Sequence, residues 1–220
     1  MIRNIAFLHT VPFLVDMFSK LAAENLPGVT CFHMVDDGIL KEVFRDGVKA
    51  PRVLRRILQQ SVLAGEAGAE LVVFTCSSTS PAVDFVRPLS DVQIMKVDEP
   101  MAERAVELGT RIGVITTAET TLGPSADLIK KEAERQGKAV VVDARLEADA
   151  FKARISGDIA EHDRIISKVC ADLAAKNDVV VLAQASMAHL AVSLQENIGR
   201  PVLSSPPLCM KALKKLAGNC

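Results

Sequence analysis

The stretch ELVVFTCSST, Glu70–Thr79, runs from an acidic residue through an apolar segment into a cysteine and three hydroxyl side chains. A similar stretch, DVVVLAQASM, occurs later in the chain as Asp178–Met187. Short apolar runs that end in small polar residues are typical of strands buried on both faces of a parallel sheet. Because the run occurs twice, the sequence predicts an α/β fold built from two copies of one unit.

The offset that places Glu70 on Asp178 also aligns three further pairs of segments. These pairs are RNIAFLHT (3–10) with RIGVITTA (111–118), RIL (56–58) with RII (164–166), and VQIM (92–95) with RPVL (200–203). Agreement at one offset indicates internal duplication. We expect two similar parallel-sheet α/β lobes related by a pseudo-twofold axis, residues 1–98 and 99–205, followed by a C-terminal helix over residues 206–220.

Apolar runs and helical spacing predict how the elements alternate. Expected strands cover residues 3–8, 29–34, 71–75, 92–97, 111–116, 139–142, 179–183 and 201–204. Expected helices lie near residues 13–21, from 51 to 65 or 68, and near 120–136, 157–176 and 186–198.

The composition argues against several classes of partner. The 26 basic and 27 acidic residues nearly balance, which gives no electrostatic footprint for nucleic acid or an anionic membrane. No stretch approaches the roughly 20 apolar residues that span a bilayer, and the N-terminus lacks a signal sequence. Five cysteines without framework spacing suit a reducing compartment, so we expect a cytoplasmic protein.

Ligands of open parallel sheets bind at the carboxyl ends of the strands. Cys76 follows the first repeated strand, and Gln184 occupies the corresponding place after the second. With the halves facing each other, a thiol and an amide would line one cleft. A cysteine after an apolar strand can also be a buried packing residue, and this reading stays open.

The paired strand–Cys–small-polar loops resemble the aspartate/glutamate/hydantoin racemase superfamily, which includes maleate isomerases and arylmalonate decarboxylases. The resemblance covers nearly the whole chain. It implies that a cysteine in each half moves protons on opposite faces of a carbon next to a carboxylate. VVFTCSSTS carries the first cysteine as Cys76, whereas VVVLAQASMA has Gln184 in place of the second. The sequence therefore departs from a two-thiol mechanism.

Hydroxyl side chains surround both expected loops. Ser80 and Pro81 predict a helix start, with Ser80 as N-cap, so Cys76 would precede a helix N-terminus that can lower the pKa of its thiol. A second helix is expected to open at Pro124. The candidate substrate-binding residues, which could also be ordinary caps and turns, are His9, Thr10, Ser77, Ser78, Thr79, Thr116, Thr117, Thr120, Gln184, Ala185 and Ser186, with Thr121 beside them.

The histidines leave two readings open. His9 could pair with the Cys76 thiolate or tie down its own loop, and His189 could be a substitute base or point along a helix face. Cys31 and His33 are interpreted as core, Cys170 as packing, and Cys209 and Cys220 carry no motif. We expect no metal site.

Motifs for nucleotides, zinc and serine hydrolases are absent, so we expect no cofactor. The sequence predicts a cofactor-independent, racemase-like isomerase that acts on a small amino-acid, hydantoin or dicarboxylate-type substrate through Cys76. The alternatives are a single-cysteine decarboxylase of malonate-type acids and a non-catalytic carboxylate-binding protein. The resemblance also implies a homodimer.

Overall fold

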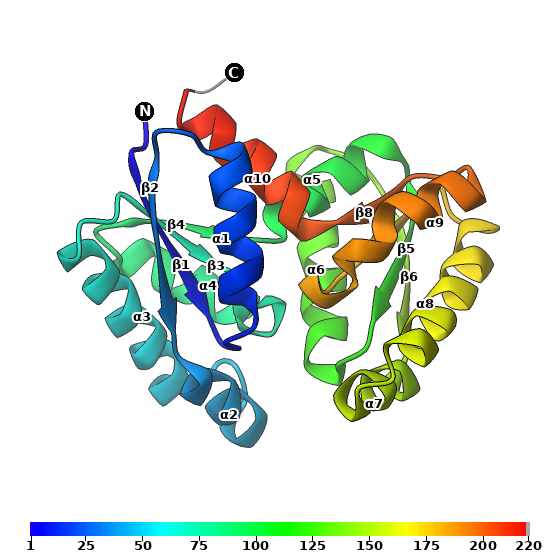
Figure 1. The fold of residues 1–220 in the computed structure, drawn as a ribbon, viewed down its shortest axis with the longest axis horizontal. Helices are drawn as coiled ribbons and strands as arrows, with labels where there is room; N and C mark the ends of the chain where they lie inside the picture. Colours follow the sequence, from blue (N-terminus) through cyan, green and yellow to red (C-terminus); the bar gives the residue numbers. More distant parts are fainter. Residues whose placement is uncertain (219–220) are drawn as a thin grey trace. The chain divides into compact units, whose positions relative to one another are not determined.

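The computed structural model describes residues 1–218, and the chain divides into two compact α/β units (Figure 1). The first unit comprises Met1–Val97 together with the segment from Pro206 onward, and the second comprises Asp98–Ser205. Each unit contains one four-stranded parallel sheet with flanking helices, which confirms the predicted α/β class. Cys220 lies outside the described residues.

The sheet of the first unit has the strand order β2-β1-β3-β4. Its strands are β1 (Asn4–His9), β2 (Thr30–Val35), β3 (Leu71–Phe74) and β4 (Gln93–Lys96). Its helices are α1 (Leu14–Asn25), α2 (Asp37–Asp46), α3 (Pro51–Glu66), α4 (Ser80–Val86) and α10 (Ser205–Leu216), with 3-10 turns η1 (Ser77–Thr79) and η2 (Arg87–Leu89).

The sheet of the second unit repeats this order as β6-β5-β7-β8. Its strands are β5 (Arg111–Thr116), β6 (Val141–Leu146), β7 (Val179–Leu182) and β8 (Val202–Ser204). Its helices are α5 (Glu99–Leu108), α6 (Glu119–Arg135), α7 (Ala148–Ser156), α8 (Ile159–Ala174) and α9 (Ala191–Ile198), with the 3-10 helix η3 (Ala185–Leu190). No helix in residues 1–218 is long and apolar enough to cross a membrane.

Equivalent carboxylates anchor the first strand of each sheet. Glu70 accepts hydrogen bonds from the backbone N–H groups of Arg3 and Asn4, at 2.5 and 3.0 Å. In the second unit, Asp178 accepts bonds from the N–H groups of Thr110 and Arg111, at 3.0 and 2.8 Å. The offset that places Glu70 on Asp178 also places Arg3 on Arg111. The hydrogen bonds to these two carboxylates instead make Arg3 equivalent to Thr110.

The sheet ladders show the same slip by one position. The Thr75 N–H bonds to the Leu8 carbonyl, whereas the Ala183 N–H bonds to the Ile115 carbonyl. The offset that places Glu70 on Asp178 therefore holds for β3 and β7 but is wrong by one for β1 and β5. As a consequence, His9 is equivalent to Thr116, and Thr10 is equivalent to Thr117.

Two predicted helix starts differ from the structure. Pro124 lies inside α6, which already begins at Glu119, because a proline in the second turn removes only one helical hydrogen bond. Ser80 is the first residue of α4 and not its N-cap, since the 3-10 turn η1 leads directly into that helix. The turn brings the helix start closer to Cys76 than the sequence analysis predicts.

Other boundaries also move. The helix expected over residues 186–198 is a 3-10 helix followed by α9. The strand expected at 139–142 is instead β6, which extends to Leu146, because the edge strand tolerates polar residues that interrupt its apolar run. On this strand Arg145 Nε donates to Asp143 Oδ1 at 2.9 Å.

Candidate active site

Cys76 lies where β3 ends and η1 begins. Its backbone is extended, and its carbonyl oxygen accepts bonds from the Thr79 N–H at 3.0 Å and from the Thr79 hydroxyl at 2.7 Å. The residue is half-buried, while Ser78 and Thr79 are buried. The turn therefore folds back over the cysteine and fixes its backbone.

Burial raises the pKa of the Cys76 thiol above its ordinary value. Hydrogen bonds from the Ser78 hydroxyl and from the backbone N–H groups of Ser78 and Thr79 oppose this shift. The helix start alone predicts a lowered pKa for the Cys76 thiol. In the folded chain, desolvation outweighs these donors, so the resting side chain is a thiol that already faces groups able to stabilise a thiolate.

The Thr10 hydroxyl lies beside the same sulfur. It also acts to lower the pKa of Cys76, although its geometry falls short of a well-formed hydrogen bond. Thr10 is only 2% exposed, and within residues 1–218 its Oγ1 has no hydrogen-bond partner. A buried donor in this condition is available to a ligand.

Gln184 occupies the equivalent place after β7, with a fixed orientation. Its Oε1 accepts from the Thr117 N–H at 2.5 Å and from the Thr117 hydroxyl at 2.8 Å. A backbone N–H can only donate, so the bonded atom must be the amide oxygen. The Nε2 group is the other end of the amide, and it can act only as a donor.

The remaining threonine candidates of the second unit belong to two elements. Thr116 is the last residue of β5 and is buried, and its hydroxyl bonds the Arg145 carbonyl at 3.5 Å. Thr120 and Thr121 lie in the first turn of α6. Ala185 and Ser186 begin η3 and are partly buried. Thr117 is thus the threonine with a bond to Gln184.

His9 is fully buried, and both of its ring nitrogens are occupied. Nδ1 lies 2.8 Å from Thr75 Oγ1, and Nε2 lies 2.9 Å from His33 Nδ1. Burial is the main cause that lowers the pKa of His9 to about 4, with His33 adding to it. The structure therefore supports the reading in which His9 ties down its surroundings. His33 is half-buried and bonded, not the core residue the sequence analysis took it to be.

His189 turns toward α8. Its Nε2 lies 3.0 Å from Asp163 Oδ2, and the same carboxylate contacts His162 Nδ1 at 2.7 Å. His189 is therefore engaged on the helix side, as the second of its two readings had it. Cys170 is fully buried in the apolar core, as expected for a packing residue.

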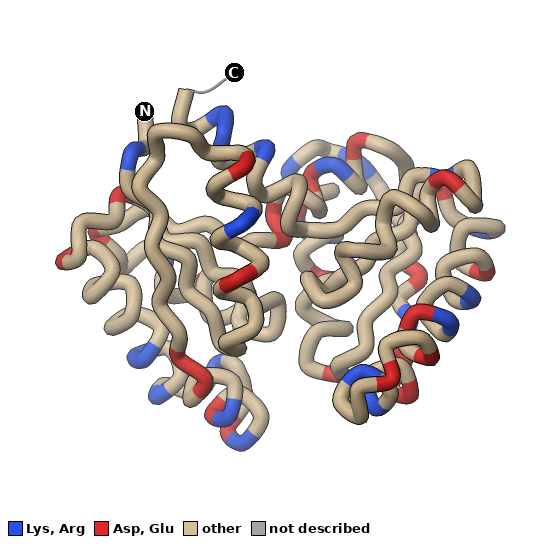
Figure 2. The backbone as a smooth tube through the Cα atoms, viewed as in Figure 1, with Lys and Arg blue, Asp and Glu red and all other residues tan. Residues whose placement is uncertain are grey.

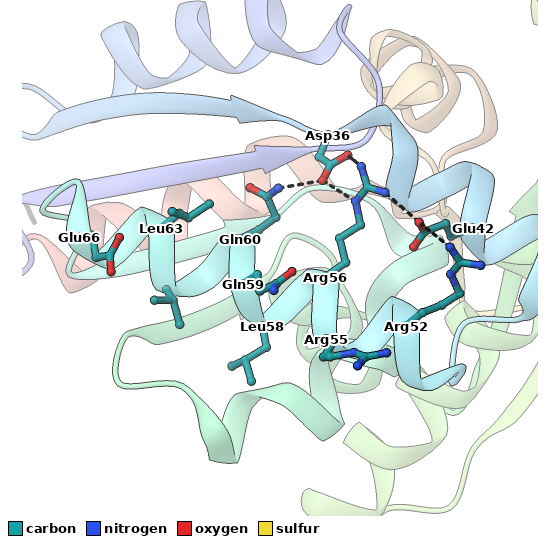
Figure 3. A pocket seen from close by; sticks show the side chains of 11 residues that line it. Asp36, Glu42, Arg52, Arg55, Arg56, Leu58, Gln59, Gln60, Leu63 and Glu66 are labelled. Carbon is teal, nitrogen blue, oxygen red and sulfur yellow. Dashed lines mark hydrogen bonds and ion pairs between the residues drawn. The ribbon is translucent and has the colours of Figure 1, made fainter.

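A separate hollow of about 800 Å³ lies along α3 (Figure 3). Among the arginines that line it, Arg56 bonds Asp36 at 2.7 and 2.8 Å and Glu42 at 2.8 Å. None of the predicted site residues lines it. Charges of both signs are interspersed along the helices of each unit (Figure 2), and residues 1–218 hold no cluster of three metal-binding side chains.

The sequence profile described as Asp/Glu/Hydantoin racemase matches residues 12–213. The chain belongs to this racemase family. Both Cys76 and Gln184 lie within the matched segment, and a comparison with curated protein sequences gives no match.

Solved structures of two racemases and of a decarboxylase share the fold. An aspartate racemase from Picrophilus torridus has a TM-score of 0.75 at 13% identity, covering 98% of this chain and 94% of that chain. An allantoin racemase from Klebsiella pneumoniae has a TM-score of 0.73 at 18% identity, covering 98% and 88%. An arylmalonate decarboxylase has a TM-score of 0.60 at 14% identity, covering 98% and 92%. At these identities the likeness establishes the fold alone.

Proposed function

We propose that this racemase-family protein is a cofactor-independent enzyme in which Cys76 transfers a proton at the carbon next to a carboxylate. The substrate is a small amino-acid, hydantoin or dicarboxylate-type acid. The observation that carries the proposal is the thiol at the end of β3, which sits among hydroxyl and N–H donors beside the unpartnered Thr10 hydroxyl. The same proposal includes a cytoplasmic homodimer.

The resting thiol suits the role of an acid. When negative charge develops on the substrate carbon, the S–H bond breaks and a C–H bond forms. The sulfur keeps the electron pair as a thiolate, which the N–H groups of Ser78 and Thr79 stabilise. Such groups need no reorganisation, because they already surround the sulfur in the free protein.

Racemisation needs a second group that removes a proton from the opposite face. Gln184 has no acid or base capacity near neutral pH, but its Nε2 can donate to a carboxylate or carbonyl oxygen. We therefore assign Gln184 a binding role. Because position 184 carries no thiol, a racemase or isomerase reaction would need a different group as its base.

The single neutral thiol favours decarboxylation as a second candidate. In that reaction the bond between the carbon and a departing CO₂ breaks, and its electron pair stays on the carbon. Cys76 then supplies the proton to one face, so no base is required. A malonate-type acid, which loses one carboxylate and keeps the other, fits this chemistry.

A substrate panel in D₂O tests the proposal. Amino acids, hydantoins, dicarboxylates and malonate-type acids are incubated with the wild type, and proton NMR follows loss of the signal next to the carboxylate. Exchange without CO₂ release supports the racemase or isomerase reaction, and release of CO₂ with deuterium in the product supports the decarboxylase. If acids of this panel bind without either reaction, the proposal fails and the non-catalytic binding protein takes its place.

A further inference from the structure

Four side chains of the first unit form one continuous chain of hydrogen bonds. Ser19 Oγ on α1 lies 2.9 Å from His33 Nε2 on β2, and His33 Nδ1 lies 2.9 Å from His9 Nε2 on β1. His9 Nδ1 lies 2.8 Å from Thr75 Oγ1, and the Thr75 hydroxyl donates to the Leu8 carbonyl at 3.0 Å. The chain joins the exposed side of α1 to the residue before Cys76.

The last bond fixes the direction of all the others. A carbonyl oxygen only accepts, so the single hydroxyl proton of Thr75 goes to Leu8. His9 Nδ1 must then carry a proton and donate it to Thr75 Oγ1. A neutral His9 accepts at Nε2 from His33 Nδ1–H, and His33 Nε2 in turn accepts from the Ser19 hydroxyl. In this arrangement each neutral imidazole gives one hydrogen bond and takes one.

The surroundings of the rings favour this neutral state. His9 is 0% exposed, and burial lowers the pKa of both His9 and His33. The two imidazoles lie edge to edge across their N···N bond with centroids 5.2 Å apart, and the ring of His33 lies nearly parallel to that of Phe7 with centroids 5.5 Å apart. These contacts hold the rings nearly parallel, at 17° for the histidine pair.

The chain and Cys76 lie on opposite faces of β3. Successive side chains of an extended segment alternate between faces, and the backbone remains extended through Cys76. Thr75 points to His9, so Cys76 points the other way, toward Thr10. His9 therefore approaches Cys76 only through the backbone of the strand.

We infer that Ser19 and His33 are positioning residues of the Cys76 site, which hold Thr75 through His9, and that this chain excludes His9 from proton exchange with Cys76. The inference deepens the proposed function and rests on the proposed role of Cys76. Its tests use readouts other than turnover, so the two can fail separately.

Imidazole nitrogen chemical shifts test the directed chain. The protein has four histidines, so His9→Asn and His33→Asn variants assign the signals of ¹⁵N-labelled protein. At neutral pH we expect both rings to be protonated at Nδ1 and unprotonated at Nε2. An imidazolium or the Nε2–H tautomer at either residue would overturn the chain. Ser19→Ala, at an exposed position, should shift His33 Nε2 and leave the His9 tautomer unchanged; an unmoved His33 Nε2 contradicts it.

Alkylation of Cys76 by iodoacetamide, followed by peptide mass spectrometry, tests the positioning. His33→Ala and Thr75→Val should speed labelling at least about fivefold, because losing one net hydrogen bond of about 1 kcal/mol opens the strand end more often. His33→Asn, which retains an N–H donor toward His9, and Thr75→Ser should stay within about twofold of the wild type. Equal rates in each conservative and non-conservative pair would overturn the positioning role.

The outcomes separate this inference from the proposed function. If the tautomers and labelling rates are as expected but no acid in the D₂O panel is turned over, the positioning of Cys76 is supported. The proposed enzymatic activity is then contradicted. If the protein turns over an acid while His9 is an imidazolium, the proposed activity is supported and the directed hydrogen-bond chain is contradicted.

Discussion

At the scale of single residues, the two strand ends share one arrangement with different chemistry. Thr10 lies beside the Cys76 sulfur, and the equivalent Thr117 donates twice to Gln184. In the first unit the threonine hydroxyl has no hydrogen-bond partner among residues 1–218, whereas in the second the amide oxygen already accepts it. The first strand end thus keeps an open donor and a proton, while the amide of Gln184 at the second presents its Nε2 group as a donor.

Substitutions at Gln184 distinguish the roles of its Oε1 and Nε2 groups. Gln184→Ala removes both, and Gln184→Glu retains an oxygen for Thr117 but replaces the Nε2 donor with a second, negatively charged acceptor. We expect both variants to bind a carboxylate inhibitor at least about tenfold more weakly, with Gln184→Glu the weaker, since a charge-assisted hydrogen bond is worth roughly 1.5–3 kcal/mol. Isothermal titration calorimetry measures the affinities. Unchanged affinity in Gln184→Glu would rule out Nε2 as a ligand donor.

Because His9 is buried and neutral, we expect the free energy of unfolding to decrease as the pH falls. Its pKa drops from 6.5 in the unfolded chain to about 4 in the folded protein, so the unfolded state binds the proton more readily. The stabilisation is complete above pH 6.5 and is lost as the pH falls toward 4, by up to about 3 kcal/mol.

Urea unfolding at several pH values between 7 and 4 measures this loss. His9→Asn is the matched variant, because an amide cannot titrate in this range while it can still donate to Thr75. The wild type should lose stability more steeply than the variant over this interval. Parallel curves for the two proteins would contradict a depressed pKa at His9.

At the scale of elements, prediction succeeded where burial leaves a simple pattern. β3 and β7 are buried at every position, so their apolar runs stand out in the sequence. The edge strand β6 was predicted too short because its polar residues face solvent. The helices α2, α5 and α7 were not predicted, since their residues are held largely by tertiary packing against neighbours such as α3 and α8.

The candidate site was predicted only in part for a related reason. Sequence spacing marks Cys76 and Gln184, because each follows a repeated strand. His33 alone on a strand resembles a core residue, and only its distance from His9 reveals the chain of hydrogen bonds. The lowered pKa expected for Cys76 failed because a helix start is visible in sequence, whereas the desolvation of the sulfur is not.

Asp163 connects α8 to the turn that follows Gln184. It contacts His162, which is 1% exposed, and His189, whose side chain is 46% exposed. Asp163→Asn should lower the free energy of unfolding by about 1–2 kcal/mol, because two hydrogen bonds lose their charged acceptor. Asp149→Asn, which removes only a surface pair with Lys152, is the control and should have no measurable effect. Equal urea midpoints for both variants would contradict the connection.

At the scale of the whole molecule, duplication has preserved the scaffold and let the strand ends diverge. Both sheets have the same strand order, and α3 and α8 begin and end at equivalent residues at the offset that places Glu70 on Asp178. These two carboxylates fix the first strand in each unit by the same two backbone bonds. The scaffold therefore tolerates a thiol in one copy and an amide in the other, which concentrates the proposed proton transfer on Cys76.

The most direct test of that claim compares Cys76→Ser with Cys31→Ser, a half-buried cysteine on β2 outside the site. With a substrate identified in the D₂O panel, Cys76→Ser should retain the fold and the affinity for a carboxylate inhibitor. It should lose at least about a hundredfold in rate, the usual contribution of a positioned acid or base. Cys31→Ser should react at the wild-type rate. Turnover by Cys76→Ser at the wild-type rate would contradict the proposed role of the thiol.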